Sequence, residues 1–170
     1  PGDPDGWGRA RITINDADPR IYCFWRAVID QNERFVREVE TVHVSVRQWR
    51  VCRQVYEARD LRQWFQLGFA TFFLNRTTRS GIIHNGGPIG GYDQTGNYKI
   101  DARFNRDQLV RRIQRIGIYS DRIQVSDLDG LALLKEISRN RSRARRTLVY
   151  LDPPYYAKGH ELYMNNFTHD

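Results

Sequence analysis

The chain has 170 residues, 40% of them hydrophobic and 12% aromatic, so it is long enough to bury a core and is not a disordered protein. No segment approaches the roughly 20 apolar residues that a membrane helix needs, so we expect no membrane partner. The net charge of +7 favours a nucleic-acid partner, although a solvated basic face gives the same value. Cys23 and Cys52 have no His or Cys nearby at ligand spacing, so we expect buried thiols and no metal site.

A short strand and a helix are predicted at the start of the chain. Residues 11–14 alternate in polarity as a strand does, and they end at Asn15 and Asp16. Asp18 followed by Pro19 is typical of a helix start, because Asp caps the first amides and Pro fits the first helical position. The apolar residues that follow have helical spacing, so one face belongs to the core. Asp16 is alternatively only a cap of this helix.

Three further helices are predicted before the last third of the chain. They begin at Ser45, at about Asp60 and at Arg106, and each carries apolar residues at helical spacing. Between the last two, six glycines break any helix, so we expect a loop and β-hairpin with exposed tips over residues 75–99. The arginines that flank this segment are suited to phosphate contacts, and they are Arg76, Arg79, Arg103 and Arg106.

Two more strands are predicted around a helix in the last third. Residues 122–125 form a short strand, and a helix follows over residues 131–137, with Asp127 as its alternative cap. The arginine-rich residues 139–146 are expected to be an exposed loop. Residues 147–151 are a continuous apolar run of strand length, as in a buried parallel strand. Strands that alternate with helices indicate an α/β sheet, interrupted by the glycine-rich insertion.

The last predicted strand ends in Asp152-Pro153-Pro154-Tyr155, where α/β sheets bind their ligands. An exocyclic amino group of a base is a weak nucleophile, because its lone pair is delocalised into the ring. The Asp152 carboxylate and the Pro153 carbonyl are able to accept hydrogen bonds from its two N–H groups. The ring of Tyr155 is able to stack on a flipped base, and its π face favours a nearby sulfonium. The alternative interpretation is a simple turn at the end of a strand.

With these four residues, the chain resembles the Dam-type (D12 class) adenine-N6 DNA methyltransferases, whose catalytic motif is Asp-Pro-Pro-Tyr after an apolar strand. Three other segments are similar to the family, in the family's order: Ile14-Asn15-Asp16 with Pro19 and Phe24-Trp25, Phe73-Leu74-Asn75-Arg76-Thr77 with Ser80-Gly81, and Val125-Ser126-Asp127-Leu128. The family's Phe-x-Gly-x-Gly loop has no counterpart before Ile14. We therefore expect a fragment that lacks the first strand and the C-terminal strands.

The resemblance implies an α/β fold, namely a Rossmann-like class I methyltransferase sheet with helices on both faces, incomplete at both ends. Residues 1–74 and 104–170 are then the partial methyltransferase domain, and residues 75–103 are an inserted target-recognition hairpin. The implied activity is transfer of a methyl group from S-adenosyl-L-methionine to adenine N6 in double-stranded DNA. We expect a cytoplasmic monomer, and a cognate restriction endonuclease is compatible with this class.

The resemblance also implies three groups of site residues. The catalytic group is Asp152, Pro153, Pro154 and Tyr155. The cofactor group, in which Asp16 binds the ribose hydroxyls and the residues near Asp127 line the adenine, is Asn15, Asp16, Ser126, Asp127, Leu128 and Asp152. The DNA-binding group, with arginines for phosphates and amides for base edges, is Asn75, Arg76, Arg79, Ser80, Asn85, Gln94, Asn97 and Arg103.

Several alternatives stay open at this point. The amides of the insert are able to stabilise turns instead, and Asn75-Arg76 is alternatively the end of a helix. Cytosine-N4 methylation uses the same amino-group chemistry, and a catalytically silent DNA-binding module of the same fold fits the basic charge.

Overall fold

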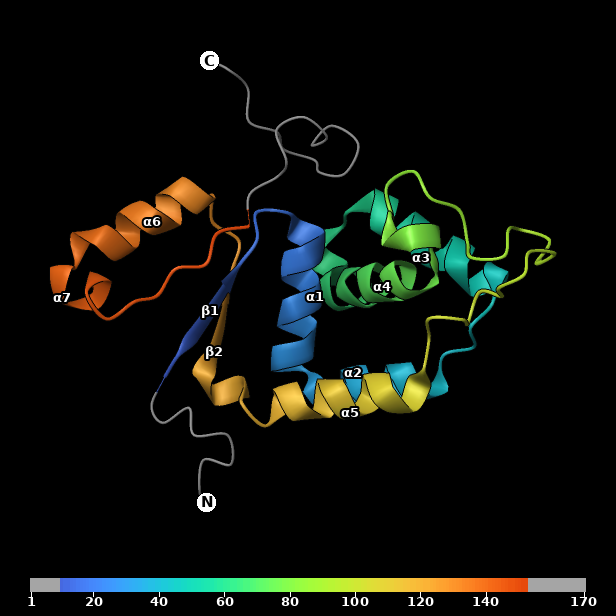
Figure 1. Cartoon of the computed structure of the whole chain (residues 1–170), viewed down its shortest axis with the longest axis horizontal. Helices are drawn as coiled ribbons and strands as arrows, with labels where there is room; N and C mark the ends of the chain where they lie inside the picture. The colour runs from blue at the N-terminus through green and yellow to red at the C-terminus, as the bar shows by residue number, and fades with distance from the viewer. Residues whose placement is uncertain (1–9, 153–170) are drawn as a thin grey trace, which may run out of the picture. The chain divides into compact units, whose positions relative to one another are not determined.

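The computed structural model describes residues 10–152, which fall into one unit up to Asp127 and a second from Leu128 (Figure 1). The first unit contains β1 (Ile12–Asn15), α1 (Pro19–Asp30), α2 (Asn32–Thr41), α3 (Val46–Ala58), η1 (Leu61–Gln63), α4 (Trp64–Thr77), η2 (Arg79–Gly81), α5 (Arg106–Gly117), η3 (Ser120–Arg122) and β2 (Ile123–Ser126). The second unit contains α6 (Gly130–Arg139) and α7 (Arg141–Ala144).

The two strands of the first unit pair in parallel. Ile12 lies opposite Ile123, and the pairing continues in register to Asn15 opposite Ser126. One step further on, the amide of Asp16 donates to the carbonyl oxygen of Ser126 at 3.1 Å. The predicted strands at residues 11–14 and 122–125 are thus confirmed, each shifted by one residue, and they are the only strands within residues 10–152.

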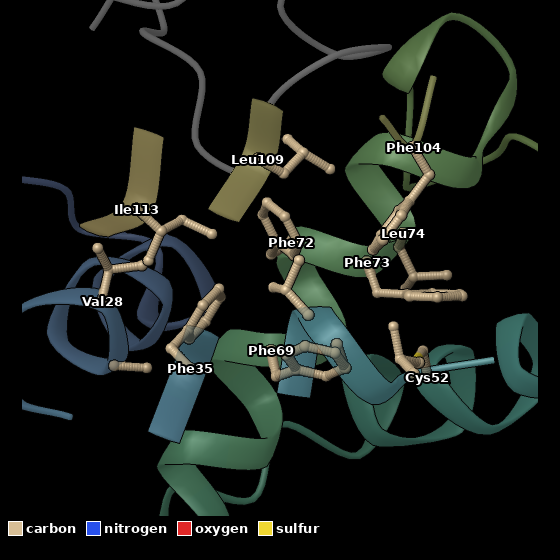
Figure 2. Packing of buried hydrophobic residues seen from close by; sticks show 14 of the residues in the cluster. Val28, Phe35, Cys52, Phe69, Phe72, Phe73, Leu74, Phe104, Leu109 and Ile113 are labelled. Carbon is tan, nitrogen blue, oxygen red and sulfur yellow. The ribbon is translucent and has the colours of Figure 1, made fainter. Parts of the chain in front are cut away.

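An aromatic core joins the helices of the first unit (Figure 2). Phe35 of α2 lies at its centre, with ring centroids 5.6 Å from Phe69 and 5.3 Å from Phe72 of α4. Helices α1 and α4 approach most closely at Gly68, where an added Cβ would lie 2.3 Å from the carbonyl oxygen of Cys23. Helices α2 and α5 run side by side (Figure 1). The apolar residues predicted at helical spacing on the helix from about Asp60 therefore include aromatic rings of α4 that pack in this core.

The predicted helix starts are confirmed by their caps. Asp18 caps α1 with its side chain accepting from the amide of Arg20, and Ser45 caps α3 by accepting from Gln48. Asp60 starts the short η1, which runs into α4. Helix α5 begins at Arg106 as predicted. Local sequence signals are strong here because each cap satisfies amides that the helix leaves without partners.

The β-hairpin expected over residues 75–99 is wrong. Helix α4 continues to Thr77, and one isolated antiparallel bridge, between Thr78 and Pro88, precedes a chain of turns. Pro88 has no amide to extend the bridge, and the positive φ of Gly90 and of Gly91 turns the chain away from an extended path. The segment is a glycine-rich loop that follows a helix.

The buried strand expected over residues 147–151 is also wrong. These residues have no regular structure, and Leu148 and Tyr150 are 96% and 87% exposed. An apolar run becomes a strand only where a neighbouring strand supplies hydrogen bonds, and the sheet that the structure describes pairs only β1 with β2. The arginine-rich residues before this run are exposed, as expected, but they include the short helix α7 rather than only a loop.

Two alternative caps are excluded by the structure. Asp18, not Asp16, is the cap of α1, and Asp129, not Asp127, caps α6 by accepting from the amide of Ala132. Both cysteines are free and buried, as predicted. Among the described residues no group of His, Cys, Asp and Glu is arranged to hold a metal ion. Nor is any helix in that part of the chain long and apolar enough to cross a membrane.

We predict that Gly68→Ala destabilises the first unit, because its new Cβ would clash with the backbone of α1 rather than with a flexible side chain. Overpacking of this kind costs about 1–3 kcal/mol, and we expect the upper end of that range in a urea unfolding curve. Gly130→Ala is the control, because a Cβ there meets no atom within 4 Å. Equal stability of Gly68→Ala and the wild type would contradict the close contact.

Candidate active site

The carboxyl ends of β1 and β2 bring two segments of the predicted cofactor group together. Asn15 lies opposite Ser126 in the parallel register, and Asp16 is hydrogen-bonded to the same residue. Asp127 follows directly on β2, so both acidic residues leave the sheet at the same edge. Leu128 follows Asp127 in the chain and begins the second unit. Ligands of open α/β sheets bind beyond this edge of the strands.

Asp16 is held in a defined orientation at this edge. Its Oδ1 accepts the amide N–H of Asp18 at 2.8 Å, and the side chain is partly buried. Burial raises the pKa of the Asp16 carboxyl, and the nearby charge of Asp18 adds to the rise, against the lowering effect of the Asp18 amide. Ribose hydroxyls are hydrogen-bond donors, so a positioned carboxylate with its second oxygen, Oδ2, suits them chemically.

Asp18 is committed to two structural tasks. Besides capping α1, its carboxylate binds the guanidinium of Arg20, with Nε at 2.9 Å from Oδ1 and Nη2 at 2.7 Å from Oδ2. Arg20 is only 3% exposed, and its guanidinium carbon lies 4.2 Å from the ring centroid of Tyr56 in α3. Sequence reasoning missed Arg20 and Tyr56. The Asp-x-Arg spacing is a local signal for the first, but none points to the second.

Three residues of the predicted DNA-binding group converge around Gly81. Arg76, in the last turn of α4, donates from Nε and Nη2 to the carbonyl oxygen of Arg103 at 3.0 and 2.8 Å. A Cβ on Gly81 would lie 3.4 Å from the guanidinium nitrogens of Arg103 and 3.6 Å from Nδ2 of Asn75. Burial lowers the pKa of Arg76, and the positive charges of Arg103 and Arg112 lower it further. The structure thus adds Arg112, which sequence reasoning missed, to this basic cluster.

The other flanking arginines differ in what they contact. The guanidinium of Arg106 donates to the carbonyl oxygens that end α2, those of Val39, Glu40 and Val42, which is a structural task. Arg79 and Ser80 are exposed on η2, and Ser80 has a left-handed backbone with φ of 56°. Arg79 and Ser80 therefore face solvent at the start of the glycine-rich segment.

The amides expected to contact bases fall into two kinds. Nε2 of Gln94 donates to the carbonyl oxygens of Ile89 and Gly91 at 2.7 and 2.6 Å, and its Oε1 accepts the amide of Ile100 at 2.8 Å. Both amide hydrogens of Gln94 are therefore used inside the loop, which favours the structural role for it. Asn85 and Asn97 have exposed side chains.

The catalytic group is described only at its first residue. Asp152 is exposed and follows the irregular residues 147–151 in the second unit. Pro153, Pro154 and Tyr155 lie outside the described residues.

Two parallel strands separated in the chain by helices are an α/β arrangement. The family model for D12 class N6 adenine-specific DNA methyltransferases matches residues 9–170, and the chain therefore belongs to this family. No curated protein and no solved structure matches the chain. Membership confirms the predicted resemblance and favours adenine N6 over cytosine N4 as the methylated atom.

Proposed function

We propose that the chain binds S-adenosyl-L-methionine beyond the ends of β1 and β2 and methylates adenine N6 in double-stranded DNA through Asp152. The observation that carries the cofactor site is the parallel register, which sets Asp16 beside Ser126. The family match over residues 9–170 supports the reaction. In finer detail, we propose that β1 and β2 belong to a Rossmann-like sheet in a cytoplasmic monomer, with residues 75–103 as the recognition insert.

The residues at the strand ends bind different parts of the cofactor. Asp16 accepts the ribose hydroxyls with Oδ2, while Oδ1 stays on the Asp18 amide. The residues near Asp127, namely Ser126, Asp127 and Leu128, line the cofactor adenine, and Asn15 is the remaining residue of the cofactor group. The cofactor, when bound, supplies an electrophilic methyl group on a sulfonium. The residues fit the cofactor, because its ribose hydroxyls would donate to a carboxylate that the fold has already oriented.

Catalysis falls to the residues around Asp152. The Asp152 carboxylate and the carbonyl of Pro153 accept the two hydrogens of the target amino group, which draws the nitrogen lone pair out of conjugation with the ring. Tyr155 stacks on the flipped adenine, and Pro154 completes the proposed catalytic group.

DNA is bound by the start of the insert and read by its loop. The residues that contact the DNA backbone are Asn75, Arg76, Arg79, Ser80 and Arg103. Arg76 also donates to the carbonyl oxygen of Arg103. Asn85 and Asn97 are the exposed amides for base edges. Gln94, first expected among them, holds the loop in shape instead.

The decisive experiment for the cofactor site is Asp16→Ala. Charge-assisted hydrogen bonds are worth roughly 1.5–3 kcal/mol, so the affinity for S-adenosyl-L-methionine should fall at least about tenfold in calorimetric titration. DNA affinity should change little in the same variant. Cofactor affinity equal to that of the wild type would refute the site.

For catalysis, we predict that Asp152→Ala lowers the rate of adenine methylation by on the order of 10²–10³, the usual loss when one positioned acceptor is removed. The measurement is single-turnover transfer of a labelled methyl group to DNA. Folding should be unaffected, because Asp152 is exposed. A variant that retained more than a tenth of the rate would show that Asp152 does not carry the reaction.

For DNA, we predict different effects for Arg79→Ala and Asn97→Ala. The first should weaken binding to all sequences alike and lower the salt slope by about one unit, as for a lost phosphate contact. The second should relax preference at one base by roughly 1–3 kcal/mol in a randomised-site methylation assay. Arg62→Ala, at an exposed arginine outside the insert, is the control. If no substitution of Asn85 or Asn97 alters site preference, the loop does not read bases.

A further inference from the structure

Asp16 is the end of a chain of contacts that reaches into α3. Asp18 donates its amide to Oδ1 of Asp16 at 2.8 Å, and its carboxylate is gripped by Nε and Nη2 of Arg20. The guanidinium of Arg20 in turn lies over the face of Tyr56, 4.2 Å from the ring centroid. The amide that orients Asp16 therefore belongs to a residue that is itself fixed from two sides.

Capping a helix does not by itself require an arginine on the capping side chain. Ser45 and Asn105 cap their helices with no arginine on the capping side chain among the described contacts. Asp60 and Arg62 repeat the Asp-x-Arg contacts at η1, with Nε at 2.9 Å from Oδ1 and Nη2 at 2.9 Å from Oδ2.

The two copies of this motif differ in their surroundings. Arg62 is 91% exposed, whereas the side chain of Arg20 is 3% exposed. Removing a guanidinium from water is costly, and a paired carboxylate offsets this cost only in part. Of these two Asp-x-Arg pairs, only the one next to Asp16 has its guanidinium removed from water.

We propose that Arg20 and Tyr56 are positioning residues for the cofactor: through Asp18 they hold the Asp16 carboxylate in the orientation and charge state that binds the ribose hydroxyls. The proposal rests on the cofactor site proposed above. It adds two residues that contact neither the cofactor nor the DNA and that act through Asp18 alone.

The electrostatics point in the same direction. Asp16 is partly buried beside the negative charge of Asp18, and both effects raise its pKa. Arg20 is the cation that offsets Asp18, so its loss should raise the pKa of Asp16 further and move cofactor binding to higher pH. Within residues 10–152, Cys23 and Tyr56 also interact with Asp18; Arg26 and Asp127 act on Cys23, and Arg53 and Arg59 act on Tyr56.

The experiment measures the affinity for S-adenosyl-L-methionine from pH 5 to pH 9 in the whole chain, together with the unfolding temperature. Arg20→Gln should weaken binding about tenfold at pH 7, the scale of one charge-assisted hydrogen bond, and shift the acidic midpoint of binding upward. Arg20→Lys keeps the positive charge but loses the two-nitrogen contact with Asp18. It should therefore restore the acidic midpoint of cofactor binding, but only part of the cofactor affinity. Arg62→Gln, in the exposed copy of the motif, should change neither quantity.

Substitutions of Tyr56 test the proposal independently if Arg20→Gln does not fold. Tyr56→Phe keeps the ring face and should lose less affinity than Tyr56→Leu. A folded Arg20→Gln that binds like the wild type, or that loses affinity equally at every pH, overturns the proposal, as does equal binding by the two Tyr56 variants. If Asp16→Ala also binds like the wild type, the cofactor site itself is wrong; if Asp16→Ala alone loses affinity, only the positioning role fails.

Discussion

The parallel pairing of β1 with β2 is the contact on which the candidate site depends. Each strand has four residues, and all five helices of the first unit lie between them in the chain. The register sets Asn15 against Ser126 and continues through the amide of Asp16. A slip of two residues would move the strand ends about 6–7 Å apart, because a strand rises about 3.3 Å per residue. A slip of one would turn every side chain to the opposite face.

Four hydrogen-bonded residue pairs are a short ladder, so the helices must hold the register. Helix α1 leaves β1 and α5 leads towards β2, and Asn32 ties these two helices together. Its Nδ2 donates to the carbonyl oxygens of Val28 at 2.8 Å and Ile113 at 2.9 Å. Gly117 leaves the room for this side chain, since a Cβ there would lie 2.4 Å from Asn32 Oδ1. One partly buried amide thus links the two helices that adjoin the strands of the site.

The sequence predicted those parts of the fold whose causes are local. Asp18-Pro19 and Ser45 start helices because a cap needs only its own next few amides. The apolar run over residues 147–151 has the composition of a strand, but composition does not supply a neighbouring strand to pair with it. The expected hairpin failed for a similar reason, because glycine and proline signal a turn without specifying which segments pair across it.

The same distinction holds for the site. Residues 15–16 and 126–127 could be predicted to meet, because any two parallel strands of one sheet end at the same edge. The contact of Arg20 with Tyr56 could not, since it joins two helices whose relative position no motif reports. Gln94 shows the converse error. An amide in a glycine-rich segment fits base recognition by type, yet the side chain of Gln94 makes three hydrogen bonds to the backbone of its own loop.

Net charge is a poor guide to how this chain binds DNA, because several of its arginines bind the protein's own backbone. Arg53 donates to the carbonyls of Ile83 and His84 and so attaches the glycine-rich loop to α3. Arg106 caps the carbonyl end of α2, where the helix dipole favours a cation. Each of these guanidiniums is directed by geometry at a peptide oxygen. The charge that supports DNA binding therefore has to be counted by what each arginine contacts, and the exposed Arg79 counts for more than the overall value of +7.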